Sequence, residues 1–180
     1  MSILSRDNRT RRVVLCAILT ALAMMLSYLE VLLPITLLIP IPGFRLGLAN
    51  LVVLVAFVSL SKPDAAVISA VRIILMSLLF GTVTSFLFSA MGGILSYLML
   101  LLLSRVGRKF SFFGVSILSA AAHNCGQILA AALLFDTSVI LAYLPVLLIA
   151  SVIFGGAVGI LLNLLLPRLH PILQKGGVRT

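Results

Sequence analysis

The residues best suited to chemistry in this chain are polar side chains that interrupt long apolar stretches. His123, Asn124 and Gln127 lie close together in the apolar stretch 112–135, and Arg72 interrupts the stretch 62–80. An arginine inside a membrane costs about 3 kcal/mol or more, so it must face a cavity or a partner. Two roles stay open for Arg72: it binds or gates a ligand, or it locks helices together.

Further polar residues are expected at similar depth or nearer the outer end of the apolar stretches. A single hydrogen bond between membrane helices is worth about 0.6 kcal/mol, and serines and glycines fit that packing role. The combined set is too polar for packing alone and predicts a ligand pocket open to the outer side. The predicted pocket residues are Glu30, Arg45, Asn50, Arg72, Ser89, His123, Asn124 and Gln127.

Motifs for catalysis are missing from the sequence. It contains no P-loop motif G-x-x-x-x-G-K-[ST], which a P-loop ATPase would need. Its four acidic residues are scattered, so no pair is placed to hold Mg²⁺ against a diphosphate. No histidine, cysteine or carboxylate cluster has the spacing of a metal or haem site. We therefore expect no catalytic residue, no metal and no intrinsic cofactor.

The composition points to a membrane protein. Of 180 residues, 62% are hydrophobic and 9% are charged, with a mean hydropathy of +1.31; soluble domains carry about 25% charged residues. These values exclude a soluble globule, a disordered chain and a fibrous repeat. The net charge of +9 comes from basic residues between apolar stretches, which indicates membrane orientation rather than nucleic-acid binding.

Apolar stretches predict an all-α integral membrane protein with six transmembrane helices, forming one membrane domain over 1–180. The expected spans are 13–33, 46–60, 62–80, 85–103, 112–135 and 138–166. The second is short, so its start is expected to be partly unwound or buried in protein. The last contains Pro145 and is expected to be long, tilted or kinked, with Pro167 beginning a basic tail.

Two shorter segments complete this prediction. The stretch 34–45 is apolar but contains Pro40, Pro42 and Gly43, so we expect a lid-like outer loop rather than a span. Ser61, Pro63 and Asp64 form a good helix start, since they supply a cap, a first-turn proline and an acid at the positive helix end.

Charge distribution predicts the orientation. With six spans, eleven basic residues lie on one side and only Arg45 lies on the other. Cytoplasmic segments are enriched in Lys and Arg, so both termini are expected in the cytoplasm. We therefore predict a multi-pass protein of the bacterial cytoplasmic membrane.

Four ordered segments resemble a known bacterial membrane family. They are PGFRLGLAN at 42–50, RIILMSLLFG at 72–81, SAMGGILS at 89–96 and HNCGQ at 123–127. The resemblance covers about 13–165 and is to the family labelled heptaprenyl diphosphate synthase component I, or Gx transporter. Arg45 stands where lysine is commoner in this family.

That family looks like the substrate-binding S components of energy-coupling factor transporters. The resemblance implies a six-helix bundle with cytoplasmic termini and a first loop that covers an outward-facing pocket. It also implies that an Ala-x-x-x-Ala face on the first helix meets a coupling transmembrane subunit, and Ala17 and Ala21 fit that pattern. Separate ATPases would use the ATP. Gly155 and Gly159 form a second small-residue pair, expected to serve internal packing.

The resulting expectation is a membrane subunit that captures a small organic nutrient or precursor for uptake. The family label supports an alternative, a non-catalytic accessory that partners a soluble prenyl diphosphate synthase subunit. A third alternative is a structural partner in a membrane redox complex. A small-molecule ligand and the lipid bilayer are expected partners, and nucleic acid is not.

Overall fold

A computed structural model describes residues 3–32, 47–106, 110–135 and 138–174 of the chain. These ranges contain helices and no strand, which confirms the predicted all-α membrane bundle. The elements are α1 (Ile3–Leu32), α2 (Asn50–Ser59), α3 (Lys62–Phe80), α4 (Val83–Val106), α5 (Phe112–Phe135), the 3-10 helix η2 (Ser138–Tyr143) and α6 (Leu144–Gln174). The expected lid-like loop 34–45, including Arg45, lies outside the described residues.

Helix α2 differs from the other helices in length. α1 and α3 to α6 are long and apolar enough to cross a membrane, whereas α2 has ten residues. Ten helical residues extend about 15 Å, half of a hydrocarbon core of roughly 30 Å. Within the expected span 46–60, residues 47–49 form a turn and the helix begins at Asn50, so the start of this segment is not helical.

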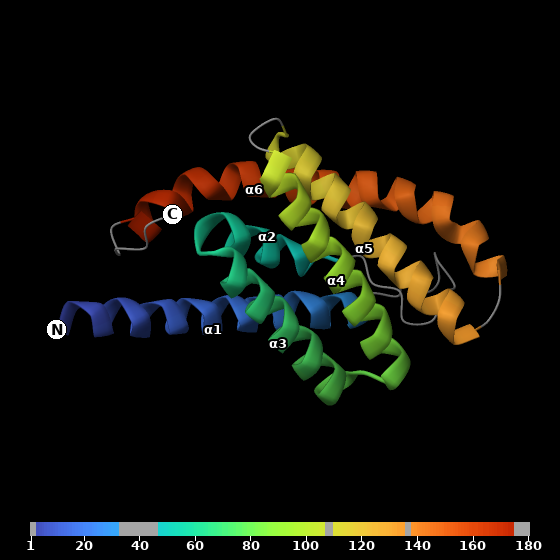
Figure 1. The fold of residues 1–180 in the computed structure, drawn as a ribbon, viewed down its shortest axis with the longest axis horizontal. Helices are drawn as coiled ribbons and strands as arrows, with labels where there is room; N and C mark the ends of the chain where they lie inside the picture. The colour runs from blue at the N-terminus through green and yellow to red at the C-terminus, as the bar shows by residue number, and fades with distance from the viewer. Residues whose placement is uncertain (1–2, 33–46, 107–109, 136–137, 175–180) are drawn as a thin grey trace.

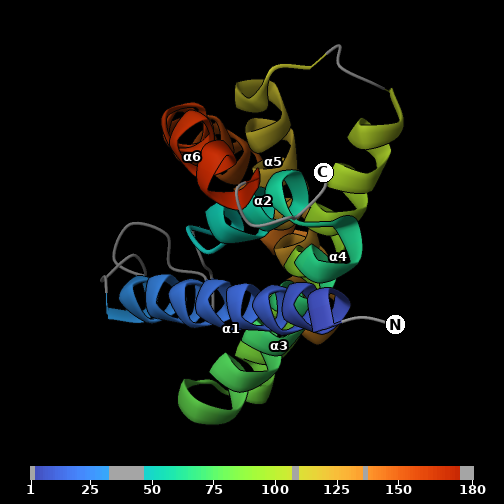
Figure 2. The same ribbon diagram turned by 90° about the vertical axis from the view of Figure 1, so that its left-hand side faces the viewer.

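Helix α2 lies at the centre of the bundle. It packs against α1, α3, α5 and α6, and its residues 52–56 are all buried. A helix that is apolar on every side lies in a protein core or spans a membrane, and α2 is too short to span one. Figure 2 shows α2 between α1 and α6. In Figure 1 the start of α1 and the end of α6 lie toward one end of the molecule, and the end of α5 and the start of α6 lie toward the other.

Close helix approach in the second half of the chain depends on glycines. A Cβ added at Gly126 would lie 2.5 Å from the Met91 carbonyl oxygen, and one at Gly159 would lie 2.7 Å from the Phe113 Cα. These distances are below van der Waals contact, so larger residues would separate α4 from α5 and α5 from α6. Gly155 and Gly159 therefore serve internal packing, as expected.

The helix ends follow local rules with three differences from prediction. Ser61 caps α3 by accepting from the Asp64 N–H, as predicted, and Arg12 bridges to Asp64 at 2.8 Å. α1 begins at Ile3, ten residues before the start of the expected span 13–33. A hydropathy pattern detects only the apolar part of the helix, whereas the helix itself also includes the polar residues that precede this part. Pro145 is the second residue of α6, where proline is tolerated, and Pro167 lies within α6.

Candidate functional site

The start of α2 forms a polar turn deep in the bundle. Gly47 has a φ of +81°, a conformation that favours glycine, and its carbonyl accepts from the Asn50 N–H at 2.8 Å. The Leu48 N–H donates to the carboxylate of Glu30 on α1. Leu48 lies in the turn before α2, and the N–H groups of residues 50–52 donate to the carbonyls of residues 47–49. The Glu30 carboxylate therefore holds the turn that precedes α2 and lies near the positive end of this helix.

Arg72 approaches the same region from α3. Its side chain is 3% exposed, and one guanidinium nitrogen donates to the Ser27 hydroxyl at 3.0 Å. Ser27 and Glu30 are three residues apart on α1, so they share a helix face. Sequence reasoning missed Ser27, although its spacing from Glu30 was a usable signal. The structure thus places the buried Arg72 of α3 against the face of α1 that carries the buried Glu30.

His123 sits on the opposite side of the same turn. Its Nε2 lies 3.1 Å from Nε2 of Gln127, one helical turn further along α5. A Cβ added at Gly92 would lie 2.7 Å from the His123 ring, and one at Gly47 would lie 3.5 Å from it. The imidazole is therefore held between α4 and the start of α2. The close fit explains why glycine is needed at position 92.

Asn124 points to a different helix. Its side-chain nitrogen donates to the Leu147 carbonyl at 2.9 Å and to the Ser151 hydroxyl at 2.8 Å, both on α6. Adjacent residues on a helix point about 100° apart, so Asn124 leaves the face shared by His123 and Gln127. Its nitrogen joins α5 to α6, and its oxygen has no hydrogen-bond partner among the described residues.

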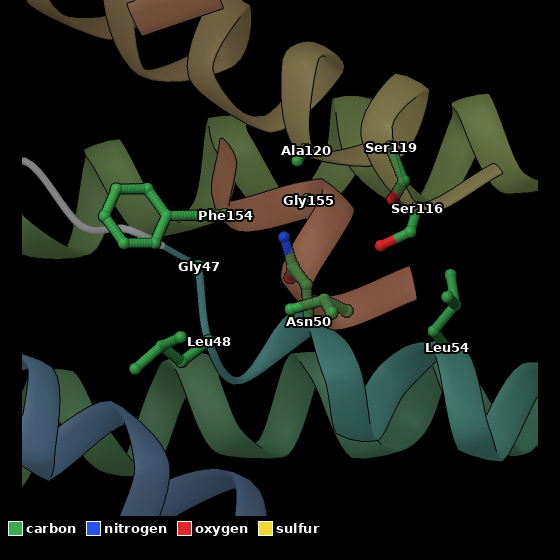
Figure 3. A pocket seen from close by; sticks show the side chains of 10 residues that line it. Gly47, Leu48, Asn50, Leu54, Ser116, Ser119, Ala120, Phe154 and Gly155 are labelled. Atoms are coloured by element: carbon green, nitrogen blue, oxygen red, sulfur yellow. The ribbon is translucent and has the colours of Figure 1, made fainter. Parts of the chain in front are cut away.

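Two further polar groups lack partners in the described part of the chain: the Asn50 side-chain nitrogen and the Ser89 hydroxyl. A buried polar group without a hydrogen bond costs about 1–3 kcal/mol, so such groups are suited to a water or a ligand. Asn50 lines a cavity of about 10 Å³, enough for roughly one water. Figure 3 shows its side chain directed toward Gly155, with Ser116 and Ser119 of α5 nearby.

We name the polar residues around this turn the polar cluster; all of them are buried except Asn50, which is half-buried. Its members are Ser27, Glu30, Asn50, Arg72, Ser89, His123 and Gln127. The turn 47–50 joins its two halves, because Leu48 meets Glu30 while Gly47 meets His123. Ser89 lies on α4 one turn before Gly92. Ala17 and Ala21 are exposed on α1, away from this cluster.

The polar cluster is equipped for recognition. It combines a guanidinium, a carboxylate, an imidazole and two amides, which together suit a carboxylate or carbonyl group on a ligand. The described residues contain no group of three His, Cys, Asp or Glu side chains that could hold a metal ion. Whether Arg45 contributes stays a prediction, since it lies outside these residues.

Comparison with known families gives one match. The model of the family described as heptaprenyl diphosphate synthase component I matches residues 19–165, which include the polar cluster and α2 to α5. Comparison with curated proteins and with solved structures found no match. Because the family model covers most of the sequence, the chain belongs to the heptaprenyl diphosphate synthase component I family.

Proposed function

We propose that this protein is the substrate-capture subunit of an uptake system, with the polar cluster as its ligand site. The observation that carries the proposal is the start of α2, a helix that begins half-way through the bundle beside Glu30 and His123. Transporters bind substrates at such interrupted helices, whose N-termini carry the positive end of the helix dipole and attract anionic groups. Buried ionisable residues in a membrane protein also mark substrate pathways more often than passive packing.

The ligand class follows from the groups in the cluster. Arg72 and the α2 N-terminus favour an anionic or carbonyl-bearing group. In this structure the Leu48 N–H donates a hydrogen bond to the Glu30 carboxylate. A ligand carboxylate could take its place at that N–H. Since the adjoining cavity holds roughly one water, such a ligand enters only when the turn 47–50 or α1 shifts.

The exposed face of α1 is the proposed contact with a coupling transmembrane subunit. Ala17 and Ala21 lie on it together with Ile18 and Met25, which are 58% and 55% exposed. Small residues let another helix approach closely within a membrane. In this arrangement the coupling subunit and separate ATPases supply the energy, and this chain performs no catalysis.

Substitution on this face tests the transport role. Ala17→Trp or Ala21→Trp should leave ligand binding unchanged and abolish uptake, because the indole would hold the coupling helix away. Leu22→Trp is the matched control, since Leu22 lies at the edge of the same exposed face and already carries a large side chain. Uptake that survives both alanine substitutions contradicts the proposed coupling surface.

The family description favours a second candidate function, that of a non-catalytic membrane accessory to heptaprenyl diphosphate synthesis. This candidate predicts a stable complex with a soluble prenyl diphosphate synthase subunit and an altered product chain length when the accessory is removed. A pull-down from solubilised membranes that recovers no synthase subunit would exclude it. The same pull-down, probed for ATPase subunits, is expected to support the transport role.

A further inference from the structure

A large apolar cavity begins one helical turn along α2 from Asn50, and Leu54 lines both this cavity and the small cavity beside Asn50. The volume of the large cavity is about 640 Å³, and it lies between the second half of α2, the end of α4 and the start of α5. In Figure 2 the end of α4 and the start of α5 lie apart from each other. The lining residues are Leu54, Phe57, Val58, Leu100, Leu103, Ser104, Phe110, Ser111, Phe112 and Val115.

The cavity wall suits a flexible hydrocarbon chain. Eight of its ten lining residues are Leu, Val or Phe, and the two serines come from the outermost turns of α4 and α5. Its volume falls within the range of roughly 300–1,000 Å³ that is typical of ligand pockets. Because the wall is apolar except at the two serines, an occupant should place an apolar chain inside and a polar group near Ser104 and Ser111.

Two basic residues lie next to residues that line the cavity. Lys62 Nζ lies 6.0 Å from the ring of Phe57, which lines the cavity, and Arg105 follows Ser104 in the last turn of α4. Ser111 caps α5 by accepting from the Gly114 N–H at 3.2 Å, so the positive end of that helix also faces the rim. The acid beside Lys62 on α3, Asp64, is paired with Arg12.

We propose that this cavity binds an anionic phospholipid, with one acyl chain between α2, α4 and α5 and the phosphate between Lys62 and Arg105. Basic pockets between membrane helices bind anionic headgroups on the cytoplasmic side, where such lipids are abundant. The predicted orientation places this end of the bundle on that side. The site stands apart from the proposed transport function, since it shares no residue with the polar cluster.

Fluorescence quenching tests the proposal, because the chain contains no tryptophan. Phe112→Trp places a single reporter at the cavity, in vesicles of brominated phosphatidylglycerol mixed with phosphatidylcholine. Each rim cation should favour the anionic lipid by about fivefold, so the reporter should be quenched at low phosphatidylglycerol fractions. Leu102→Trp is the matched control, since Leu102 is 55% exposed at the same end of α4. Its quenching should follow the bulk lipid composition.

Charge removal supplies the decisive comparison. Lys62→Gln with Arg105→Gln should abolish the preference at Phe112→Trp and leave Leu102→Trp unchanged. Quenching of both reporters to the same extent at every phosphatidylglycerol fraction would overturn the proposal. So would recovery of the fluorescence by farnesyl diphosphate at concentrations well below the lipid, because that would assign the cavity to a prenyl diphosphate.

A measurement on the unmodified chain guards against a reporter that fails to fold. Native mass spectrometry from mixed vesicles should retain one phosphatidylglycerol per chain, and the Lys62→Gln, Arg105→Gln variant should retain at least about fivefold less. No retained lipid on the wild-type chain, or equal retention of both lipids, would overturn the proposal.

Discussion

The polar cluster and the apolar cavity lie in different parts of the bundle and differ in packing. Around the start of α2, charged and amide side chains are buried with room for about one water, whereas the other end of α2 borders a cavity of about 640 Å³. The groups that could recognise a ligand and the larger space that could hold one therefore lie on successive turns of α2, with Leu54 lining both cavities. A ligand at the cluster requires movement, while the cavity is already formed.

Physical reasons for this difference lie in the residues themselves. Buried polar groups are costly unless they are hydrogen-bonded, so the cluster needs close approach between helices. Gly47 and Gly92 permit that approach to His123. At the other end, bulky rings such as Phe57 and Phe112 line the walls, and the end of α4 lies apart from the start of α5. Stability is therefore expected to be sensitive to small changes in the cluster and tolerant of change in the cavity.

The largest expected effect comes from Arg72→Ala. It removes the donor to Ser27 and a charge from a region that contains Glu30, so the free energy of unfolding should fall by about 3 kcal/mol or more. Reversible unfolding in mixed detergent micelles measures this change. Arg72→Lys is the conservative comparison and should restore part of the loss. An Arg72→Ala variant as stable as wild type would show that this arginine does not hold the cluster together.

Gly92→Ala should have the next largest effect. The added Cβ would lie 2.7 Å from the His123 ring, and overpacking of this kind costs about 1–3 kcal/mol. Gly114→Ala is the matched control, because its Cβ would meet neighbours only at 3.7 Å or beyond and alanine favours the helix by up to about 1 kcal/mol. If both variants lose equal stability in the same unfolding assay, the tight fit around His123 is not important.

Asn124→Ala should cost about 1 kcal/mol, since membrane hydrogen bonds of this kind contribute about 0.6 kcal/mol on average and two are lost. This variant separates helix packing from ligand recognition. We expect reduced thermal stability with unchanged ligand affinity. Reduced affinity with unchanged stability would move Asn124 into the ligand site.

Val115→Phe should have the smallest effect. The larger ring enters the apolar cavity, so the free energy of unfolding should stay within about 0.5 kcal/mol of wild type. Because Gly92→Ala adds only one methyl group yet should cost more, the two variants compare the regions directly. A large loss for Val115→Phe would mean that the cavity is filled by packed protein.

The sequence predicts the long helices well because their limits are chemical. Ser61, Pro63 and Asp64 start α3, and its predicted range 62–80 coincides with the observed helix. Hydropathy cannot place the start of α2, since the turn 47–49 is as apolar as the helix that follows. What fixes that start is the φ of Gly47 and the Glu30 contact, both of which depend on tertiary structure.

The candidate site residues were also predicted only in part from the sequence. The clustering of Arg72, His123 and Gln127 in depth follows from their position along apolar spans, and the sequence reveals it. The partner of each side chain depends on helix rotation, which the sequence leaves open. Thus Ser27 was missed as the partner of Arg72, and Asn124 proved to bond to α6.

The central claim is that the polar cluster binds a small molecule, and extraction of ligand from purified protein tests it most directly. Protein purified from native membranes in mild detergent is denatured, and the released small molecules are identified and counted by mass spectrometry. Apart from phospholipid, we predict close to one anionic or carbonyl-bearing molecule per chain for wild type and for Gly114→Ala, and loss of that molecule in a folded His123→Gln variant. Equal release from wild type and His123→Gln, or no release from wild type, would contradict the claim.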